Sequence, residues 1–566
     1  MRAPRGPMIA LAAALGAGVA LRIFHLASGR SLYIDEARLA LNIGSRGFSG
    51  LLSPLDYEQT APIPFLFGEK LAVMAGGMNE VALRFLPFLA GIATLFVMYR
   101  LAVRLLPAPA AAVAVALAGV SPAMIQYSNE AKPYSIDALI GSLITLLGIE
   151  LLASPHDRAR WRAYAIAGTV AVLVSTPGII VVTGLTAALL ADAQVRRNGL
   201  LRTRLVGGAV LWGVLFAAIY IAFYRSVSQL PYMQSFWQPA FLTRGDGALV
   251  TRAGRMAGDV LWGIFRGGPY FHTTTRETFP LVILMAAGLA VVAVAGAVFV
   301  ARRAGVTILF ALLSPVAVTV VAAAMGVYPI TLRLVQFCVP ALIILVVGGA
   351  ALAVQRAPAG RQSVLMAVIA AALLVRPAIR ATLPAFQSYQ WQELRPLVRQ
   401  YESAGHDEPV YVFANAVPAW LFYTTDWEHP DRARLAWYAR MASVGGPAFE
   451  NAPPRPHAVA SEGEGLEYRA GRRREIVGIS TGDQWRVLVG SRNGRPDEGW
   501  AENESRRIVA AAEPSVWLVF SHYRGSENLL FDRIEAQGLV QDLGEPAKGA
   551  HLFRYTRTKT AMRRPG

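Results

Sequence analysis

Long apolar runs separated by short polar segments occupy the first two thirds of the chain. A helix needs about 20 apolar residues to cross a bilayer. Nine runs approach or reach that length, namely 8–28, 81–105, 108–126, 133–153, 205–225, 279–300, 305–326, 331–353 and 362–379. A less clear stretch at 163–191 is interrupted by Thr176-Pro177-Gly178, as a helical hairpin requires. The pattern predicts a mostly α polytopic membrane protein with about eleven transmembrane helices.

The composition agrees with this prediction and limits the partners. The chain is 54% hydrophobic and only 16% charged, with a mean hydropathy of +0.40, which is outside the range of soluble domains. A net charge of +17 would suggest nucleic acid in a soluble protein. Here the arginines lie between apolar runs, where they orient the chain, so we expect no nucleic-acid partner. The single cysteine, Cys338, excludes an intramolecular disulfide.

The positions of the arginines predict the direction of each crossing. Cytoplasmic loops carry an excess of Lys and Arg. Six clusters can all be cytoplasmic if the stretch at 163–191 crosses an even number of times: Arg2 and Arg5; Arg100 and Arg104; Arg158, Arg160 and Arg162; Arg196, Arg197, Arg202 and Arg204; Arg302 and Arg303; Arg356 and Arg361.

This orientation places all candidate chemistry on one side. The outer segments are 29–80, 121–132, 226–278, 327–331 and everything after 380. We therefore expect an integral protein of the cytoplasmic (inner) membrane. Its active site and C-terminal domain would lie on the periplasmic or extracellular side.

Two domains are predicted. Residues 1–380 form the transmembrane domain, and its first outer loop, 29–80, carries juxtamembrane helices at about 36–47 and 62–76. After about residue 384 charges increase and strand-like stretches appear, so residues 381–566 are predicted to form a soluble, extracytoplasmic α/β domain. Its expected elements are strands Val410–Ala414, Glu475–Ile479, Trp485–Val489, Val516–Ser521 and His551–Tyr555, and a helix over Asn528–Gln537. No Walker loop, dinucleotide-binding glycine pattern or Cys/His metal spacing occurs, which argues against a nucleotide-driven pump.

Acidic residues mark two outer segments. Asp35 and Glu36 follow the first apolar run, and an acidic pair near hydrocarbon is better explained by chemistry than by packing. Glu130 lies on a short turn before Pro133, which starts the next run. Simpler interpretations are a solvated loop pair for the first site and, for the second, a Glu130–Lys132 surface pair or charges at the entry to a helix.

These motifs, taken together, resemble a known enzyme group. The features are the Asp-Glu pair after the first run, Ala82-Leu-Arg-Phe-Leu-Pro87, Tyr127-Ser-Asn-Glu-Ala-Lys-Pro-Tyr134, and the outward C-terminal domain. In this order they resemble the GT-C membrane glycosyltransferases, nearest the protein O-mannosyltransferase and lipid A aminoarabinose transferase group. The resemblance is strongest over 30–135. It implies inverting transfer of a hexose or pentose from a polyprenyl-phosphate donor to an acceptor hydroxyl on a glycolipid, polysaccharide or protein.

The resemblance also implies roles for individual residues. Asp35 matches the catalytic base, Glu36 would orient it or the acceptor, and Glu130 matches the second acidic residue. A sugar phosphate already has a good leaving group, so the enzyme chiefly needs a base and cations for the departing phosphate. The outer cations are Arg84, Lys132 and Arg333; the two arginines are equally interpretable as interface anchors.

One departure from the family pattern concerns the phosphate. Aminoarabinose transferases carry a lysine just before the proline that opens the second juxtamembrane helix, whereas this chain reads Tyr57-Glu-Gln-Thr-Ala-Pro62. That contact must be made differently or by another residue. The substrate-binding candidates are Tyr57, Gln59, Tyr134, Tyr270 and His272, although aromatic residues also gather at any membrane interface.

Three other interpretations differ from this prediction. Asp35, Glu36 and Glu130 could share a divalent ion, but the resemblance implies none, and we expect no metal and no cofactor. A transporter or flippase of lipid-linked saccharides would need ionisable residues inside its spans; Asp137 and Glu150, near the ends of one run, are marginal cases. A membrane-anchored scaffold would leave the outer acidic residues unexplained.

Overall fold

The chain forms two compact units in a computed structural model. The described residues are 5–243, 249–266, 279–386, 392–404, 408–430, 432, 435, 467–470, 473–476, 479–480, 486–490, 498–512, 514–521 and 527–558. The helical unit comprises Met1–Gly29, Ala61–Ser226 and Ser235–Ser388; the α/β unit comprises Arg30–Thr60, Val227–Gln234 and Tyr389–Gly566. Residues 30–60, the larger part of the predicted first outer loop, therefore group with the C-terminal residues.

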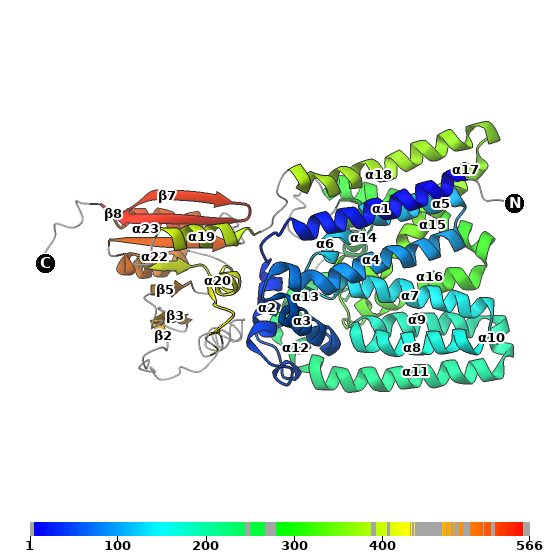
Figure 1. The fold of residues 1–566 in the computed structure, drawn as a ribbon, viewed down its shortest axis with the longest axis horizontal. Helices are drawn as coiled ribbons and strands as arrows, with labels where there is room; N and C mark the ends of the chain where they lie inside the picture. Colours follow the sequence, from blue (N-terminus) through cyan, green and yellow to red (C-terminus); the bar gives the residue numbers. More distant parts are fainter. Residues whose placement is uncertain are drawn as a thin grey trace. The chain divides into compact units, whose positions relative to one another are not determined.

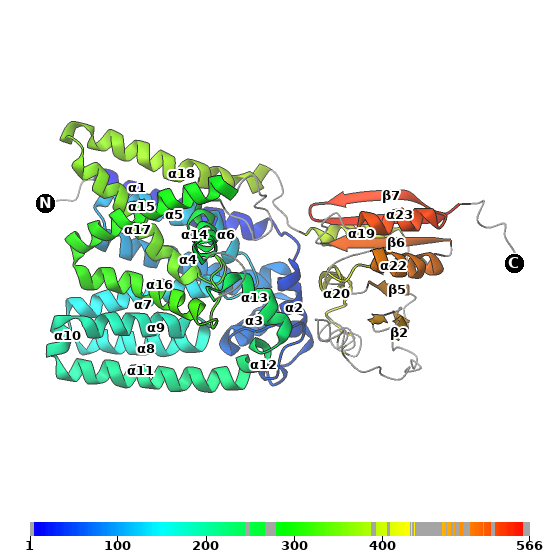
Figure 2. The same cartoon turned by 180° about the vertical axis from the view of Figure 1, so that it is seen from behind.

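The helical unit contains the apolar helices (Figure 1). They are α1 (Arg5–Ala27), α3 (Ile63–Gly76), α4 (Glu80–Leu105), α5 (Ala108–Val120), α6 (Pro122–Ser128), α7 (Tyr134–Ala153), α8 (Arg158–Val174), α9 (Gly178–Ala191), α10 (Ala193–Arg197), α11 (Gly199–Ile219), α14 (Leu249–Arg266), α15 (Phe279–Ala304), α16 (Val306–Ala324), α17 (Val339–Arg356) and α18 (Gln362–Phe386). Two short helices, α12 (Arg225–Ser228) and α13 (Pro231–Trp237), span the sequence boundaries between the units. Helices α7, α8, α9 and α11 lie side by side in both views (Figures 1 and 2).

Eight helices of the described chain are long and apolar enough to cross a membrane, and the bent pair α5–α6 would be a ninth. The predicted break inside 163–191 is present, because α8 ends at Val174 and α9 begins at Gly178. Helix α9 has 14 residues, which makes it shorter than these candidate spans, and it is not counted among them. The predicted fold class, a mostly α polytopic membrane protein with a C-terminal α/β domain, is confirmed.

Three predicted boundaries differ from the structure. The run at 108–126 is not one helix, because it bends by 51° between α5 and α6, where Pro122 lacks the N–H group that a continuous helix needs. The run at 331–353 becomes helical only at Gln336, with a 3-10 turn over Gln336–Cys338 before α17, so Arg333 lies in the preceding loop. The segment 226–278 contains the 18-residue helix α14, whose buried side chains include Met256, Val260 and Ile264.

The α/β unit is built around a six-stranded sheet. Its helices are α2 (Ile34–Ser45), α19 (Leu394–Ser403), α20 (Val417–Thr424), α22 (Glu498–Ala511) and α23 (Asn528–Ala536). Its strands are β1 (Val410–Val412), β2 (Glu467–Ala470), β3 (Arg473–Ile476), β4 (Ile479–Ser480), β5 (Arg486–Val489), β6 (Ser515–Ser521), β7 (Leu539–Ala547) and β8 (Ala550–Arg557). The sheet order is β4-β5-β1-β6-β8-β7, with β5, β1 and β6 parallel; β2 and β3 form a separate antiparallel pair.

Both faces of strand β6 are covered. Side chains alternate between the faces of a strand, and Val516, Leu518 and Phe520 join the apolar core of α22 and α23. Trp517 points the other way, and its ring lies 5.8 Å from that of Tyr401 on α19. The predicted strand Glu475–Ile479 overlaps the end of β3 and the start of β4, and its residues 477–478 lie outside the described residues.

Candidate functional site

The two carboxylates that open α2 have different environments. Glu36 is completely buried (0% exposed), accepts the Tyr33 N–H at 3.0 Å and lies 3.6 Å from the Arg30 guanidinium. It thereby closes the first turn of α2 in the manner of a capping box. The Asp35 side chain is 24% exposed. Of the two, Asp35 is the one available to a substrate.

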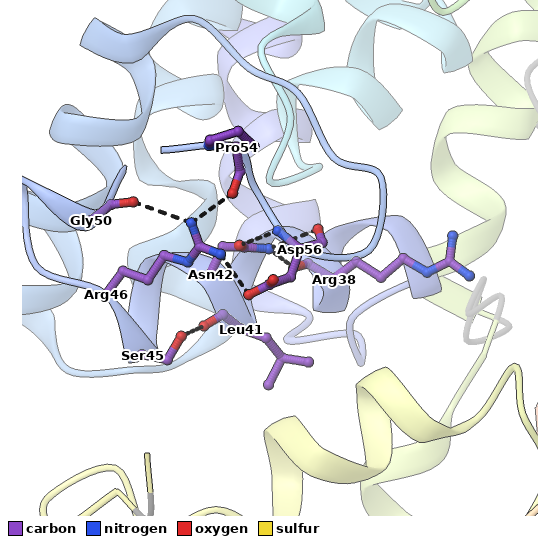
Figure 3. A network of polar contacts seen from close by, with 8 residues as sticks. All are labelled: Arg38, Leu41, Asn42, Ser45, Arg46, Gly50, Pro54 and Asp56. Carbon is purple, nitrogen blue, oxygen red and sulfur yellow. Dashed lines mark hydrogen bonds and ion pairs between the residues drawn. The ribbon is translucent and has the colours of Figure 1, made fainter. Parts of the chain in front are cut away.

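Arg38 is a neighbour of Asp35 that the sequence prediction missed. Its Nη1 lies 3.9 Å from Oδ1 of Asp35, at the limit for an ion pair, and its side chain is only 14% exposed. Its Nε is buried with no hydrogen-bond partner among the described residues. Figure 3 shows the Arg38 side chain extending away from Asn42 and Asp56. The sequence does contain a signal for this contact, because residues three positions apart on a helix are neighbours on its surface.

Tyr57 and Gln59 lie on one constrained turn that is tied to α2. Tyr57 and Glu58 have left-handed backbones, with φ of 62° and 52°, which is uncommon for residues with a Cβ and rare for a bulky one. The turn is held by Asn42, whose side chain bonds both the N–H and the carbonyl of Asp56, while Arg46 pairs with the Asp56 carboxylate at 2.7 Å (Figure 3). Tyr57 and Gln59 are both buried, so the predicted substrate residues are preorganised rather than displayed on a mobile loop.

The second predicted acidic site, in the helical unit, is a buried turn. Glu130 and Lys132 are each only 6% exposed, which rules out the solvated surface pair. The Lys132 N–H donates to the Glu130 carbonyl at 2.6 Å, and Asn129 donates to the Ile125 carbonyl at 2.9 Å. These bonds hold the turn between α6 and α7.

Arg84 belongs to the same framework. It is almost fully buried, one turn before Pro87 on α4. The Ser135 hydroxyl, at the start of α7, donates to the Pro87 carbonyl at 2.6 Å. This bond ties the helix that carries Arg84 to the helix that follows Lys132. Burial of Arg84 argues against a snorkelling anchor, whose charge would reach water.

Arg333 is held by Trp237, which lies on a different loop from the one that carries Arg333. Its guanidinium lies 4.9 Å from the centroid of the Trp237 ring, within range for a cation–π interaction. The loops that carry the two residues are also joined through the backbone, because the Ile330 N–H donates to the Ala240 carbonyl at 2.8 Å.

The structure brings Glu130, Tyr134 and Arg333 together around Tyr127. The Tyr127 hydroxyl interacts electrostatically with these three residues and with Asp259, and the Tyr127 and Tyr134 rings are 5.3 Å apart, edge to face. Asp259 on α14 was not foreseen; burial raises its pKa to about 6, although Arg266 opposes the shift. Tyr270 and His272 lie outside the described residues.

Arg22 is the least expected charge in the helical unit. It lies on α1, is 0% exposed, and donates to the carbonyls of Gly18, Ala118 and Gly119 at 3.0, 3.3 and 3.2 Å. Pro122 cannot donate to Ala118, four residues before it. Arg22 therefore supplies a donor to that carbonyl at the break. A Cβ on Gly18 would lie 2.9 Å from the Gly119 Cα, so glycines let α1 and α5 approach closely.

Within the described ranges, no group of three or more His, Cys, Asp or Glu residues is placed to hold a metal ion.

Residues 60–223 match the family model described as dolichyl-phosphate-mannose-protein mannosyltransferase. No curated protein matches the sequence.

Solved structures show weaker similarity. ArnT from Cupriavidus metallidurans bound to undecaprenyl phosphate is 14% identical, with 96% of this chain and 97% of that chain covered and a TM-score of 0.47. The Archaeoglobus fulgidus oligosaccharyltransferase complex with Zn and sulfate is 15% identical, with 73% of this chain covered and a TM-score of 0.44; this chain spans 61% of its length. The mannosyltransferase resemblance inferred from the sequence is thus confirmed by the family model over residues 60–223.

Proposed function

We propose that the protein is an inverting glycosyltransferase that moves a sugar from a polyprenyl-phosphate donor to an acceptor hydroxyl at the outer face of the cytoplasmic membrane. The acceptor would be a glycolipid, a polysaccharide or a protein. The observation that carries the proposal is the contrast at the start of α2: Glu36 is buried in helix capping, whereas Asp35 is accessible beside the weakly paired Arg38. The family model over residues 60–223, whose description names a dolichyl-phosphate sugar, supports the donor class.

In this proposal Asp35 is the general base. It takes the proton of the acceptor hydroxyl while the hydroxyl oxygen bonds to the anomeric carbon. The bond between that carbon and the phosphate oxygen breaks, and the polyprenyl phosphate leaves with the electron pair. Attack from the face opposite the phosphate inverts the anomeric configuration. Glu36 orients α2, and Glu130 is the second acidic residue of the site.

Cations stabilise the negative charge of the leaving phosphate. We assign this role to Arg84, Lys132 and Arg333, and add Arg38. Among the described residues, the Arg38 Nε has no hydrogen-bond acceptor and the guanidinium has one carboxylate neighbour, at 3.9 Å, so its N–H groups can donate to a phosphate oxygen. Arg38 therefore offers the phosphate contact for which the chain lacks the expected lysine. Tyr57, Gln59, Tyr134, Tyr270 and His272 are proposed to contact the sugar or the acceptor.

The experiment uses purified full-length protein in liposomes with a panel of undecaprenyl-phosphate hexoses and pentoses. Glycolipid and polysaccharide profiles of cells lacking the protein would identify the missing sugar. Asp35→Asn should lower kcat by about 10² to 10⁴-fold, the usual contribution of a general base. Glu150→Gln, which removes an acid paired with Arg100 at 3.4 Å near the other end of α7, is the matched control. Normal transfer by Asp35→Asn would show that the base is another residue.

A further inference from the structure

Every backbone N–H from Ser31 to Ile34, just before and at the start of α2, donates to a side chain. Ser31 donates to Oε1 of Glu393 (2.8 Å), Leu32 to the Tyr423 hydroxyl (2.7 Å) and Ile34 to Oε1 of Gln392 (3.0 Å). Tyr33 donates to Glu36 within α2 (3.0 Å). Three of the four acceptors thus come from residues more than 350 positions away in the sequence, all within the α/β unit.

The segments at the start of α2 and of α19 supply hydrogen-bond acceptors to each other's backbone N–H groups. The first N–H groups of a helix have no partner inside it. The Arg395 N–H, in the first turn of α19, donates to the Ser31 hydroxyl at 3.2 Å, and that hydroxyl donates to Oε2 of Glu393 at 3.0 Å. Ser31 therefore caps α19, while Glu393, the N-cap residue of α19, binds the segment that enters α2.

These acceptors stand on well-packed elements. The Glu393 N–H donates to the Lys548 carbonyl between β7 and β8 at 3.0 Å. Tyr401 of α19 packs its ring 5.4 Å from Trp420 of α20, the helix that also carries Tyr423. The start of α2 is therefore connected to the sheet through short, buried contacts.

We propose that the C-terminal residues act as a positioning domain for sugar transfer, in which Gln392, Glu393 and Tyr423 fix the start of α2 and thereby aim the Asp35 carboxylate. The inference rests on the proposed function of Asp35 as the base. Gln392, Glu393 and Tyr423 are positioning residues, since each holds the segment before Asp35 through a backbone N–H, and Glu393 also through the Ser31 hydroxyl.

Tyr423→Phe tests the proposal in the full-length protein, because it removes one hydroxyl and keeps the ring. Amide exchange of the peptide covering residues 30–36, measured without donor, should become faster. With the best donor of the panel above, kcat should fall about tenfold while KM for the donor stays unchanged, as expected for misplacement of a catalytic group. Glu393→Ala should have a larger effect, and Glu393→Gln, which keeps an acceptor for Ser31, should retain most of the rate.

Tyr401→Phe is the matched control, because that hydroxyl bonds the Glu408 carbonyl at 3.1 Å within the same unit. The proposal is overturned if exchange at 30–36 is unchanged in Tyr423→Phe, if exchange rises while kcat stays normal, or if Tyr401→Phe loses as much activity. Absence of transfer by the wild-type protein with every donor would instead contradict the proposed function. The exchange data would still show whether these residues hold α2.

Discussion

The side-chain amide of Asn42 holds both backbone polar groups of Asp56. Its Nδ2 donates to the Asp56 carbonyl at 3.2 Å, and the Asp56 N–H donates to its Oδ1 at 2.9 Å. The next two residues, Tyr57 and Glu58, have left-handed backbones, a conformation that costs about 1–3 kcal/mol per residue. The Asn42 contacts offset this strain and hold the turn at a fixed position against α2.

Asn42→Ala should therefore relax the turn and lower transfer by about tenfold, a loss of about 1.4 kcal/mol. Glu58→Gly should restore part of the rate in the double variant, because glycine adopts a left-handed backbone without a Cβ penalty. Rates in liposomes measure both effects. Ser45→Ala, which removes only an intrahelical bond to Leu41 (2.6 Å), is the control. If the Asn42→Ala, Glu58→Gly double variant is no faster than Asn42→Ala alone, Asn42 does not offset the backbone strain of the turn.

Arg22→Met should destabilise the helical unit by about 2–4 kcal/mol, because the carbonyls of Ala118 and Gly119 on α5 lose the Arg22 donor. Pro122→Ala in the same chain should recover part of that loss by returning a backbone N–H to Ala118. Thermal unfolding in detergent measures the change, with Arg22→Lys, which keeps a donor, as the conservative variant. If Pro122→Ala restores no stability to the Arg22→Met variant, Arg22 does not stabilise the protein by donating to the Ala118 carbonyl between α5 and α6.

Trp237→Leu should raise KM for the lipid-phosphate donor by about 3- to 10-fold, because cation–π contacts contribute about 0.5–2 kcal/mol and Arg333 would lose its fixed orientation. Arg333→Lys should have a similar effect, since an ammonium lacks the planar, bidentate guanidinium. The control is Trp262→Leu, which removes a similar contact, 4.7 Å from Arg376. Equal effects of both tryptophan variants would refute a specific role for Arg333.

The packing of α14 should depend on pH through Asp259. Burial raises its folded pKa to about 6, from 3.8 for an exposed aspartate, so the packed state prefers the protonated acid. This stabilisation is complete below about pH 4 and is lost as the pH rises through about 6. Amide exchange in α14, corrected for its intrinsic pH dependence, should be slower at pH 5 than at pH 8. Asp259→Asn should abolish the difference; persistence of the difference would exclude Asp259 as its source.

Transfer should continue after removal of divalent ions, because arginine and lysine side chains are proposed to neutralise the phosphate. Rates would be compared in EDTA and after adding back Mg²⁺, Mn²⁺ or Zn²⁺. The prediction that no metal takes part would be wrong if transfer stops in EDTA and returns when one of these ions is added.

The sequence predicted those features that depend on local pattern. Apolar run lengths located most spans, and a carboxylate pair beside a span marked Asp35. The bend at Ser121-Pro122 was missed although a Ser-Pro pair inside an apolar run is a local breaker signal. Arg22, Asn42 and Glu393 had no such signal, because their partners are set by tertiary packing. Strand β7 was missed because its residues include Gly544 and Pro546, which rarely occur inside strands.

The mutual capping of α2 and α19 has a consequence for biosynthesis. Ser31 and Leu32 are synthesised 362 and 391 residues before their acceptors, Glu393 and Tyr423. During translation the Asp35 segment therefore leaves the ribosome long before the groups that fix it exist. The final contacts of α2 form only after the C-terminal residues have been made and folded. In the proposed mechanism, a nascent chain would carry its base from the beginning of synthesis but would become able to transfer sugar only at the end.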